Sequence, residues 1–215
     1  FALKVDSRSM LLYAVTDRAW LRGRALPALV EDAVRGGATF VQLREKEMEF
    51  AAFLDEARRV KAVTDRYHVP FVINDDIEVA RACNADGVHI GQDDAAVSEA
   101  RRILGPDKII GVSAHTVDEA RAAEQAGADY LGVGAVFSTS TKLDADIVTL
   151  QTLRGIRAAV SIPIVAIGGI NVENMLQLKG SGIDGAAVVS ALFAQQDVYA
   201  AAKRLYATSK ELVFG

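Results

Sequence analysis

Polar side chains occupy every second position of the segment VQLREK, residues 41–46, where a buried strand pattern ends. Because successive side chains of a strand point to opposite faces, we expect Gln42, Arg44 and Lys46 to share one face. Arginine offers a planar fork of donors that fits phosphate oxygens, and lysine offers a compact positive charge. The spacing therefore predicts an anion-binding strand end, against the alternative that the strand simply runs out into solvent.

The opposite face of the same segment carries Val41, Leu43 and Glu45, which we expect to point toward covering helices. Apolar side chains suit that environment, whereas an unpaired carboxylate does not. We therefore expect Glu45 to turn toward solvent or to pair with a cation, and to take no catalytic part.

Two carboxylates follow neighbouring strand patterns, Asp75 after PFVIN and Asp94 after GVHIGQD. Oxygen ligands with no histidine or cysteine between them favour Mg²⁺. The remaining coordination positions would go to water and phosphate. Asp76 and Asp93 stand beside them at the start of helical patterns, and we expect those two to cap helices.

The composition is that of an ordinary globular chain: 215 residues, 51% apolar and 24% charged, with a net charge of −4. This charge argues against a nucleic-acid or anionic-membrane surface, because no basic excess is available to neutralise phosphates. No apolar run approaches the length of a membrane span, and residues 1–10 lack the apolar stretch of a signal peptide. The single cysteine, Cys83, excludes an intramolecular disulfide and a cysteine-based zinc site. We therefore expect a cytoplasmic protein.

Short runs rich in strand formers alternate with amphipathic stretches along the sequence. The predicted strands are residues 11–16, 39–44, 70–75, 87–91, 109–114, 130–137, 163–169 and 185–192. Helical patterns lie between them, including VENMLQLKGSG at 172–182, and a closing one covers 197–211. This alternation predicts an α/β protein, a single (β/α)₈ TIM barrel spanning residues 1–215.

The active site of such a barrel lies at the C-terminal ends of its strands. Polar residues gather at those predicted ends: Thr16–Arg18, Gln42, Arg44, Lys46, Asn74–Asp76, Gln92–Asp94, Ser113, Thr139–Lys142 and Ser190. Three of them are the cations Arg44, Lys46 and Lys142, which together with Mg²⁺ predict a diphosphate ligand. Gly168 and Gly169 follow the seventh strand and Val189–Ser190 end the eighth, where barrels frequently bind a phosphate. These loops predict a second anion site.

Seven motifs together resemble the thiamine-phosphate synthase family: VQLREK, VINDD, GVHIGQDD, GVSAHT, GADYLGVGAVFSTSTK, IVAIGGI and AAVVSA. The likeness runs in order from Tyr13 to about Phe193. It implies a transferase of thiamine biosynthesis, with Mg²⁺ as cofactor. The family condenses 4-amino-5-hydroxymethyl-2-methylpyrimidine diphosphate with hydroxyethylthiazole phosphate, which gives thiamine phosphate and pyrophosphate. Ala135 and Ser138 depart from the likeness, because the family often has proline at those places.

The resemblance also implies roles for individual residues. For the pyrimidine diphosphate it implies contacts from Gln42, Leu43, Arg44, Glu45, Lys46, Asn74, Ser113 and Lys142. Among these, Arg44, Lys46, Ser113 and Lys142 are the expected catalytic residues, and Asp75 and Asp94 are the expected Mg²⁺ ligands. For the thiazole phosphate it implies contacts from Thr139, Ser140, Thr141, Gly169, Val189 and Ser190. Tyr13 is expected either to line the pyrimidine pocket or to belong to the core.

The expected reaction needs no protein nucleophile, because the ring amino group can stabilise a carbocation as pyrophosphate leaves and the thiazole nitrogen then attacks. His89 and His115 are accordingly expected to be a hydrogen-bonded strand residue and a loop residue. Two alternatives stay open: a thiazole tautomerase of the same fold, and a non-catalytic sensor of phosphate ligands. The expected partners are small-molecule substrates, with no nucleic acid and no membrane, and a homo-oligomer is left open.

Overall fold

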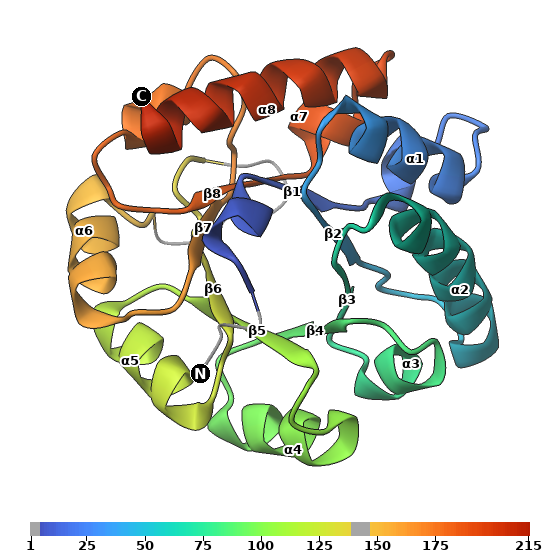
Figure 1. The fold of residues 1–215 in the computed structure, drawn as a ribbon, viewed down its shortest axis with the longest axis horizontal. Coiled ribbons are helices and arrows are strands. Elements are labelled where there is room, and N and C mark those ends of the chain that lie inside the picture. The colour runs from blue at the N-terminus through green and yellow to red at the C-terminus, as the bar shows by residue number, and fades with distance from the viewer. Residues whose placement is uncertain (1–4, 139–146) are drawn as a thin grey trace.

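Eight parallel strands close into a barrel in the order β1-β2-β3-β4-β5-β6-β7-β8, with helices around the outside (Figure 1). This computed structural model describes residues 5–138 and 147–215, apart from the side chains of residues 94 and 95. The strands are β1 Leu12–Val15, β2 Phe40–Leu43, β3 Phe71–Asn74, β4 Gly87–Ile90, β5 Ile109–Ala114, β6 Tyr130–Val133, β7 Ile164–Ile167 and β8 Gly185–Val188. The arrangement confirms the predicted TIM barrel.

The α-helices that surround the strands are α1 Leu26–Gly36, α2 Phe50–Tyr67, α3 Ile77–Ala82, α4 Asp94–Leu104, α5 Val117–Ala126, α6 Leu150–Ala159, α7 Ser190–Phe193 and α8 Val198–Phe214. Three 3₁₀ turns complete the described elements: η1 Ser7–Met10, η2 Arg18–Trp20 and η3 Met175–Leu178.

Side-chain caps explain where several of these helices begin. Asp76 accepts a hydrogen bond from the Val79 N–H at 2.8 Å, which confirms its predicted role as a cap. Thr116 and Glu119 form a reciprocal capping box at the start of α5. Each cap satisfies a backbone N–H that the helix itself leaves unpaired.

Three predicted elements differ from the structure in type or in extent. The stretch 172–182 forms only η3, because the Asn171 side-chain oxygen accepts from the N–H groups of Glu173 and Asn174 and closes a tight turn there. The strands predicted at 130–137 and 185–192 end at Val133 and Val188. The apolar residues that follow Val188 belong instead to α7.

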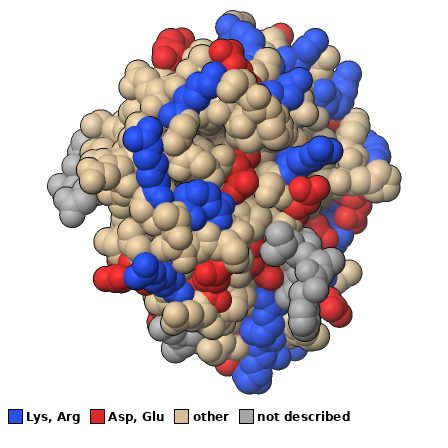
Figure 2. All heavy atoms as spheres, turned by 60° about the vertical axis from the view of Figure 1, so that its left-hand side comes forward, with Lys and Arg blue, Asp and Glu red and all other residues tan. Residues whose placement is uncertain are grey.

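On the face shown in Figure 2, lysine and arginine side chains are interspersed with aspartate and glutamate side chains. This mixture agrees with the small net charge of −4. In the described part of the chain, no helix combines the length and the apolar character that crossing a membrane requires.

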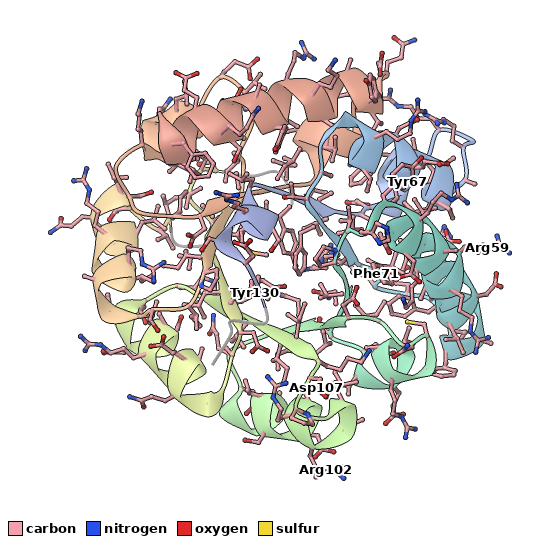
Figure 3. All side chains as sticks on the ribbon, viewed as in Figure 1. Arg59, Tyr67, Phe71, Arg102, Asp107 and Tyr130 are labelled. Atoms are coloured by element: carbon pink, nitrogen blue, oxygen red, sulfur yellow. The ribbon has the colours of Figure 1, made fainter. Side chains whose placement is uncertain are left out.

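The alternation of side chains along each strand separates two hydrophobic layers. Val41 and Leu43 of β2 belong to the outer layer between strands and helices, as predicted. The inner cluster fills the barrel and contains Val5, Met10, Tyr13, Val15, Phe40, Val72, Ile109, Tyr130, Val165 and Ala187. Figure 3 labels Tyr130 within the ring of strands.

The segment η1 closes the N-terminal end of the barrel. Met10 and Val5 are buried in the inner cluster, and η1 contacts β1, β7 and β8. Gly185 at the start of β8 leaves space for this segment, since a Cβ there would overlap the Met10 carbonyl oxygen. Among the described residues, η1 therefore closes this end of the interior, and the cavity opens at the opposite end.

Four residues at the N-terminal face repeat one bonding pattern. Each directly precedes an even-numbered strand, and its side chain accepts from a backbone N–H at the start of the preceding odd-numbered strand. The pairs are Thr39 with Leu12 at 2.9 Å, Asp86 with Phe71, Asp129 with Ile110 and Asp184 with Ile164, the last three at 2.8 Å. The backbone N–H of each of these four residues also donates to the carbonyl of its partner, at 2.7–2.9 Å.

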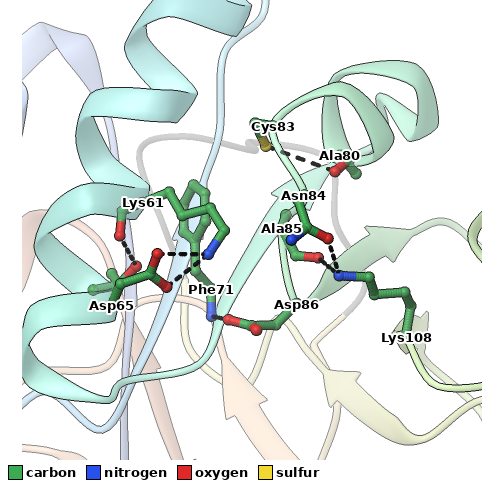
Figure 4. A network of polar contacts seen from close by, with 10 residues as sticks. Lys61, Asp65, Phe71, Ala80, Cys83, Asn84, Ala85, Asp86 and Lys108 are labelled. Carbon is green, nitrogen blue, oxygen red and sulfur yellow. Dashed lines mark hydrogen bonds and ion pairs between the residues drawn. The ribbon is translucent and has the colours of Figure 1, made fainter.

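Figure 4 shows this pattern between Phe71 and Asp86, beside the Lys108 ammonium, which donates to Asn84 and Ala85. The acidic turns NADG, GAD and SGIDG thus join neighbouring strands on the face opposite the strand C-terminal ends.

Candidate active site

A cavity of about 520 Å³ opens at the C-terminal ends of the strands. Its described lining comes from the ends of all eight strands and the loops that follow them. It includes Tyr13, Asp17, Gln42, Arg44, Asn74, Asp75, His89, Gln92, Ser113, His115, Gly132, Ala135, Ile167, Gly168, Gly169, Val189 and Ser190. A second cavity, on the N-terminal face beside Pro70, Asp86 and Lys108, contains none of the sequence-predicted site residues.

The C-terminal cavity brings together most of the predicted residues that the structure describes: Gln42, Arg44, Asn74, Asp75, Ser113, Gly169, Val189 and Ser190. Leu43, Glu45 and Lys46 are not part of its described lining. Lys46 is exposed at the rim, and Leu43 is fully buried in the outer layer. Thr139, Ser140, Thr141 and Lys142 lie outside the described residues, as does the side chain of Asp94.

Arg44 is positioned by the backbone of its own strand end. The Arg44 N–H donates to the Thr16 hydroxyl at 3.0 Å, which ties the loop after β2 to the end of β1. Within the described residues, neither Arg44 nor Lys46 forms a salt bridge with a carboxylate. The guanidinium of Arg44 therefore remains available for an anion in the cavity.

Glu45 turns away from the cavity and pairs with Arg18, whose Nε lies 3.4 Å from Glu45 Oε2. The expectation of a cationic partner is confirmed, whereas the alternative that Glu45 turns toward solvent is wrong, because its side chain is only 4% exposed. Burial raises the pKa of Glu45, and Arg18 opposes that rise. Arg18 also lies 3.7 Å from Glu56 of α2, so the pair fixes the β1 and β2 loops against that helix.

The Gln42 side chain points into the barrel, as the strand alternation predicts. It is 5% exposed, and its Nε2 donates to the Tyr13 hydroxyl at 2.7 Å. Tyr13 is 1% exposed and its ring stacks on Phe40 at a centroid distance of 4.7 Å. Tyr13 therefore both belongs to the core and lines the cavity, so the two expectations for this residue are both met.

His89 connects Tyr130 with Ser113. Its Nδ1 lies 2.9 Å from the Tyr130 hydroxyl, and its Nε2 lies 3.0 Å from Ser113 Oγ. This confirms the prediction of a hydrogen-bonded strand histidine. Burial lowers the pKa of His89 to about 4, so the imidazole is neutral at physiological pH. Burial also raises the pKa of both Tyr13 and Tyr130 well above the usual tyrosine range, which keeps both hydroxyls protonated.

Asp75 directly follows β3, and its backbone conformation presents the carboxylate to the cavity. Its φ is 62°, a left-handed conformation that aspartate and asparagine tolerate better than most residues. The Asp75 N–H donates to the His89 carbonyl at 2.8 Å, and the Asn74 amide donates to Asp75 Oδ2 at 2.8 Å. The carboxylate is thereby fixed between neighbouring strand ends while remaining exposed.

The donor set at this position fits a hard cation. In the described part of the chain, no group of three or more His, Cys, Asp or Glu side chains is arranged to hold a metal ion. A carboxylate such as Asp75 at the edge of a cavity with room for phosphate ligands matches Mg²⁺, which keeps several water or phosphate ligands and needs only one or two from protein. Asp94 begins α4 after the neighbouring strand β4.

Gly168 and Gly169 let the loop after β6 pass close to the end of β7. Both have positive φ, 103° and 66°, and the Phe137 N–H donates to the Gly168 carbonyl at 3.0 Å. A Cβ at Gly169 would lie 2.6 Å from the Ser138 carbonyl oxygen. The backbone of the β6 loop therefore lies directly against this turn.

Tyr130, which lies in β6 and is fully buried, belongs to the site although its sequence context did not indicate it. Tyr130 lies two positions before Gly132 in β6, so the two residues share one face of the strand. The pairing of β6 with β5 could have indicated that this is the inner face. Gln92 and His115 also line the cavity and are hydrogen-bonded to each other. The prediction of His115 as a loop residue is confirmed, since it follows β5.

Comparisons with known proteins point in one direction. A family model described as thiamine monophosphate synthase matches residues 12–192. The thiamine-phosphate synthase of Ruminiclostridium cellulolyticum is 52% identical over 194 residues, which are 90% of this chain and 92% of that protein. The protein of the same name from Clostridium tetani is 50% identical over 194 residues, 90% of this chain and 93% of that one. The solved thiamine phosphate pyrophosphorylase from Pyrococcus furiosus has a TM-score of 0.88 at 38% identity, covering 97% of this chain and 99% of that chain.

Proposed function

Because the chain belongs to the thiamine monophosphate synthase family, we propose that it condenses a pyrimidine diphosphate with a thiazole phosphate, giving thiamine phosphate and pyrophosphate. One observation carries the proposal. A guanidinium that forms no salt bridge within the described residues, a cavity-facing carboxylate and a glycine-rich strand end share one cavity: Arg44, Asp75 and Gly169. Two phosphorylated substrates need two anion sites, and we assign one to the Arg44 side of this cavity and the other to the Gly169 side.

The pyrimidine diphosphate is proposed to bind where β2, β3 and β5 end. Arg44 would take the diphosphate through charge-assisted hydrogen bonds, with Lys46 and Lys142 adding positive charge from the rim. Gln42, Asn74 and Ser113 would orient the pyrimidine. Leu43 and Glu45 would contribute only through their backbone, since both side chains point away from the cavity.

Asp75 and Asp94 are proposed to hold Mg²⁺. Bound there, the ion would neutralise negative charge that develops on the leaving pyrophosphate. The support is the cavity-facing Asp75 carboxylate, fixed by the Asn74 amide at 2.8 Å.

The thiazole phosphate is proposed to bind at the ends of β7 and β8. The turn at Gly168–Gly169 and the residues Val189 and Ser190 line the cavity there. The loop Thr139–Thr141, which lies outside the described residues, would add hydroxyl donors, as the resemblance to the family implies. This second anion site would place the thiazole nitrogen against the pyrimidine methylene carbon, so that proximity supplies much of the rate enhancement.

The protein's own groups would act chiefly through fixed charges. As the bond between carbon and diphosphate oxygen breaks, Arg44 stabilises the charge gathering on pyrophosphate, and the pyrimidine amino group stabilises the carbocation. The thiazole nitrogen then forms the new carbon–nitrogen bond. The neutral imidazole of His89 and the protonated hydroxyls of Tyr13 and Tyr130 add no charge to the part of the cavity where this step would take place. We further propose a cytoplasmic location, which the single cysteine and the phosphorylated substrates support.

The test supplies both phosphorylated substrates and Mg²⁺ to the purified protein and follows thiamine phosphate and pyrophosphate by mass spectrometry. Stoichiometric formation of both products is expected, with none when either substrate is omitted. Conversion of the thiazole phosphate alone into an isomer would favour a tautomerase instead. Ligand binding without any product would favour a sensor.

A further inference from the structure

A continuous chain of hydrogen-bonded side chains crosses the barrel interior from Gln42 to Ser113. Gln42 contacts Tyr13 at 2.7 Å, and the Tyr13 and Tyr130 hydroxyls lie 2.6 Å apart. Tyr130 contacts His89 at 2.9 Å, and His89 contacts Ser113 at 3.0 Å. We call this chain the relay. Its two ends, Gln42 and Ser113, are both proposed substrate contacts, whereas its three middle members have so far been described only as uncharged groups near the reaction.

The middle of the relay is enclosed by protein. Tyr130 is fully buried, Tyr13 is 1% exposed and His89 is 9% exposed. Two glycines make room for it on neighbouring strands. A Cβ at Gly111 would overlap the Tyr130 ring, and a Cβ at Gly132 would lie 3.0 Å from His89 Cε1. Water therefore has little access to the relay, and each hydroxyl hydrogen must find its acceptor within it.

The Gln42 amide fixes the direction of the relay. Gln42 donates through Nε2, so the Tyr13 oxygen accepts and the Tyr13 hydrogen goes to Tyr130. Tyr130 then donates to His89 Nδ1. The reverse direction would aim the Tyr13 hydrogen at the donor hydrogens of Gln42, which would leave a buried O–H without an acceptor.

The direction of the relay determines whether Ser113 and Gln42 donate or accept hydrogen bonds in the cavity. With Nδ1 accepting, the one hydrogen of the neutral His89 ring lies on Nε2 and donates to Ser113 Oγ. The Ser113 hydrogen is then free to point into the cavity as a donor. At the other end, Gln42 Oε1 accepts no hydrogen bond from the described residues and remains an acceptor in the same cavity.

We propose that Tyr13, Tyr130 and His89 are positioning residues that fix Ser113 as a hydrogen-bond donor and Gln42 as an acceptor toward the substrate ring. The class of ligand that such a pair recognises is a heterocycle carrying an amino donor and a ring-nitrogen acceptor. An aminopyrimidine presents both groups, whereas the corresponding oxo-pyrimidine exchanges the donor for an acceptor. The relay thus favours an aminopyrimidine over an oxo-pyrimidine. That the substrate is an aminopyrimidine rests on the proposed function.

The first test reads the tautomer of His89 in the free protein and needs no substrate. Long-range ¹H–¹⁵N correlation spectra distinguish hydrogen on Nε2 from hydrogen on Nδ1. The protein has three histidines, so variants of His68 and His115 assign the remaining signals to His89. Hydrogen on Nε2 is expected. A dominant Nδ1–H tautomer would overturn the direction of the relay.

The second test removes one hydroxyl. Tyr130→Phe keeps the ring but takes away the donor to Nδ1, so we expect a mixture of His89 tautomers. We also expect about a tenfold or larger fall in kcat/KM for the pyrimidine diphosphate, the effect of one buried hydrogen bond. The KM for the thiazole phosphate should stay unchanged. Unchanged kcat/KM for the pyrimidine diphosphate would overturn the proposal even if the tautomer changes.

The matched control is Tyr67→Phe. The Tyr67 hydroxyl donates to Glu31 at 2.8 Å in the outer helix layer, far from the barrel centre that contains Tyr130 (Figure 3). It should change neither the tautomer nor the kinetics. If Tyr130→Phe does not fold, Tyr13→Phe breaks the relay one link earlier and is judged by the same two readouts. A wild-type protein that makes no thiamine phosphate would refute the proposed function, while the tautomer measurement would still decide the relay.

Discussion

At the scale of single residues, the alternation in VQLREK has a measurable consequence. Arg44→Ala removes a contact proposed to strengthen as pyrophosphate leaves, and should cost about 2–4 kcal/mol of transition-state stabilisation. Glu45→Gln should cost far less, because that side chain pairs with Arg18 outside the cavity. The measurement is kcat/KM for both variants. Equal and small losses would mean that the strand end is only solvated.

Asp75 offers a clean test of the metal proposal, because asparagine also tolerates a φ of 62°. Asp75→Asn should leave the fold intact and remove one charged Mg²⁺ ligand. We expect a higher Mg²⁺ concentration for half-maximal rate and a lower kcat. Circular dichroism checks the fold. An unchanged Mg²⁺ titration would remove Asp75 from the metal site.

At the scale of elements, the paired bonds of the N-terminal face predict an effect on stability alone. Asp86→Ala leaves the Phe71 N–H without its side-chain acceptor, and should lower the free energy of unfolding by about 1–3 kcal/mol. Urea unfolding measures it. The control is Asp107→Ala, which removes an exposed carboxylate of the same face (Figure 3). Equal effects of the two variants would show that lost charge, not the lost bond, is responsible.

Element positions were largely predictable from the sequence, and the exceptions have local causes. Buried parallel strands read as short apolar runs, so all eight were found. Because apolar residues continue past the strand end, as in VVSAL, the sequence did not indicate where β8 ends and α7 begins. In VENMLQLKGSG, helical spacing was overridden by the Asn171 side chain.

The site was predictable only where chemistry and strand position coincide. Gln42, Arg44 and Asp75 have unusual side chains for strand ends, and the barrel topology places them on one rim. Tyr130 and His89 resemble ordinary core residues in the sequence. Their connection spans 41 residues and depends on side-chain geometry across the barrel, which no local pattern encodes.

At the scale of the whole molecule, the N-terminal end of the barrel contributes to stability, whereas the C-terminal end contains the candidate active site. Met10 is fully buried where η1 closes the N-terminal end. Met10→Ala should lower the free energy of unfolding by about 2–5 kcal/mol. We expect kcat/KM at 25 °C to stay near that of the wild type, because the cavity opens at the other end. Thermal unfolding and steady-state kinetics together decide it, and a loss of activity in a fully folded variant would contradict this division.

The closure by η1 has a consequence for the order of events. As far as the described residues show, the cavity has its entrance at one end, so the deeper substrate must bind first. Under the proposed assignments, the pyrimidine lies beside Tyr13 and Gln42, below the loops of Gly169 and Ser190. A thiazole phosphate that arrived first would obstruct the way in. We expect compulsory-order kinetics, with the pyrimidine diphosphate first, and a dead-end thiazole analogue should then be an uncompetitive inhibitor toward the pyrimidine diphosphate. Random-order patterns would mean that the loops move aside widely enough to give each substrate its own path.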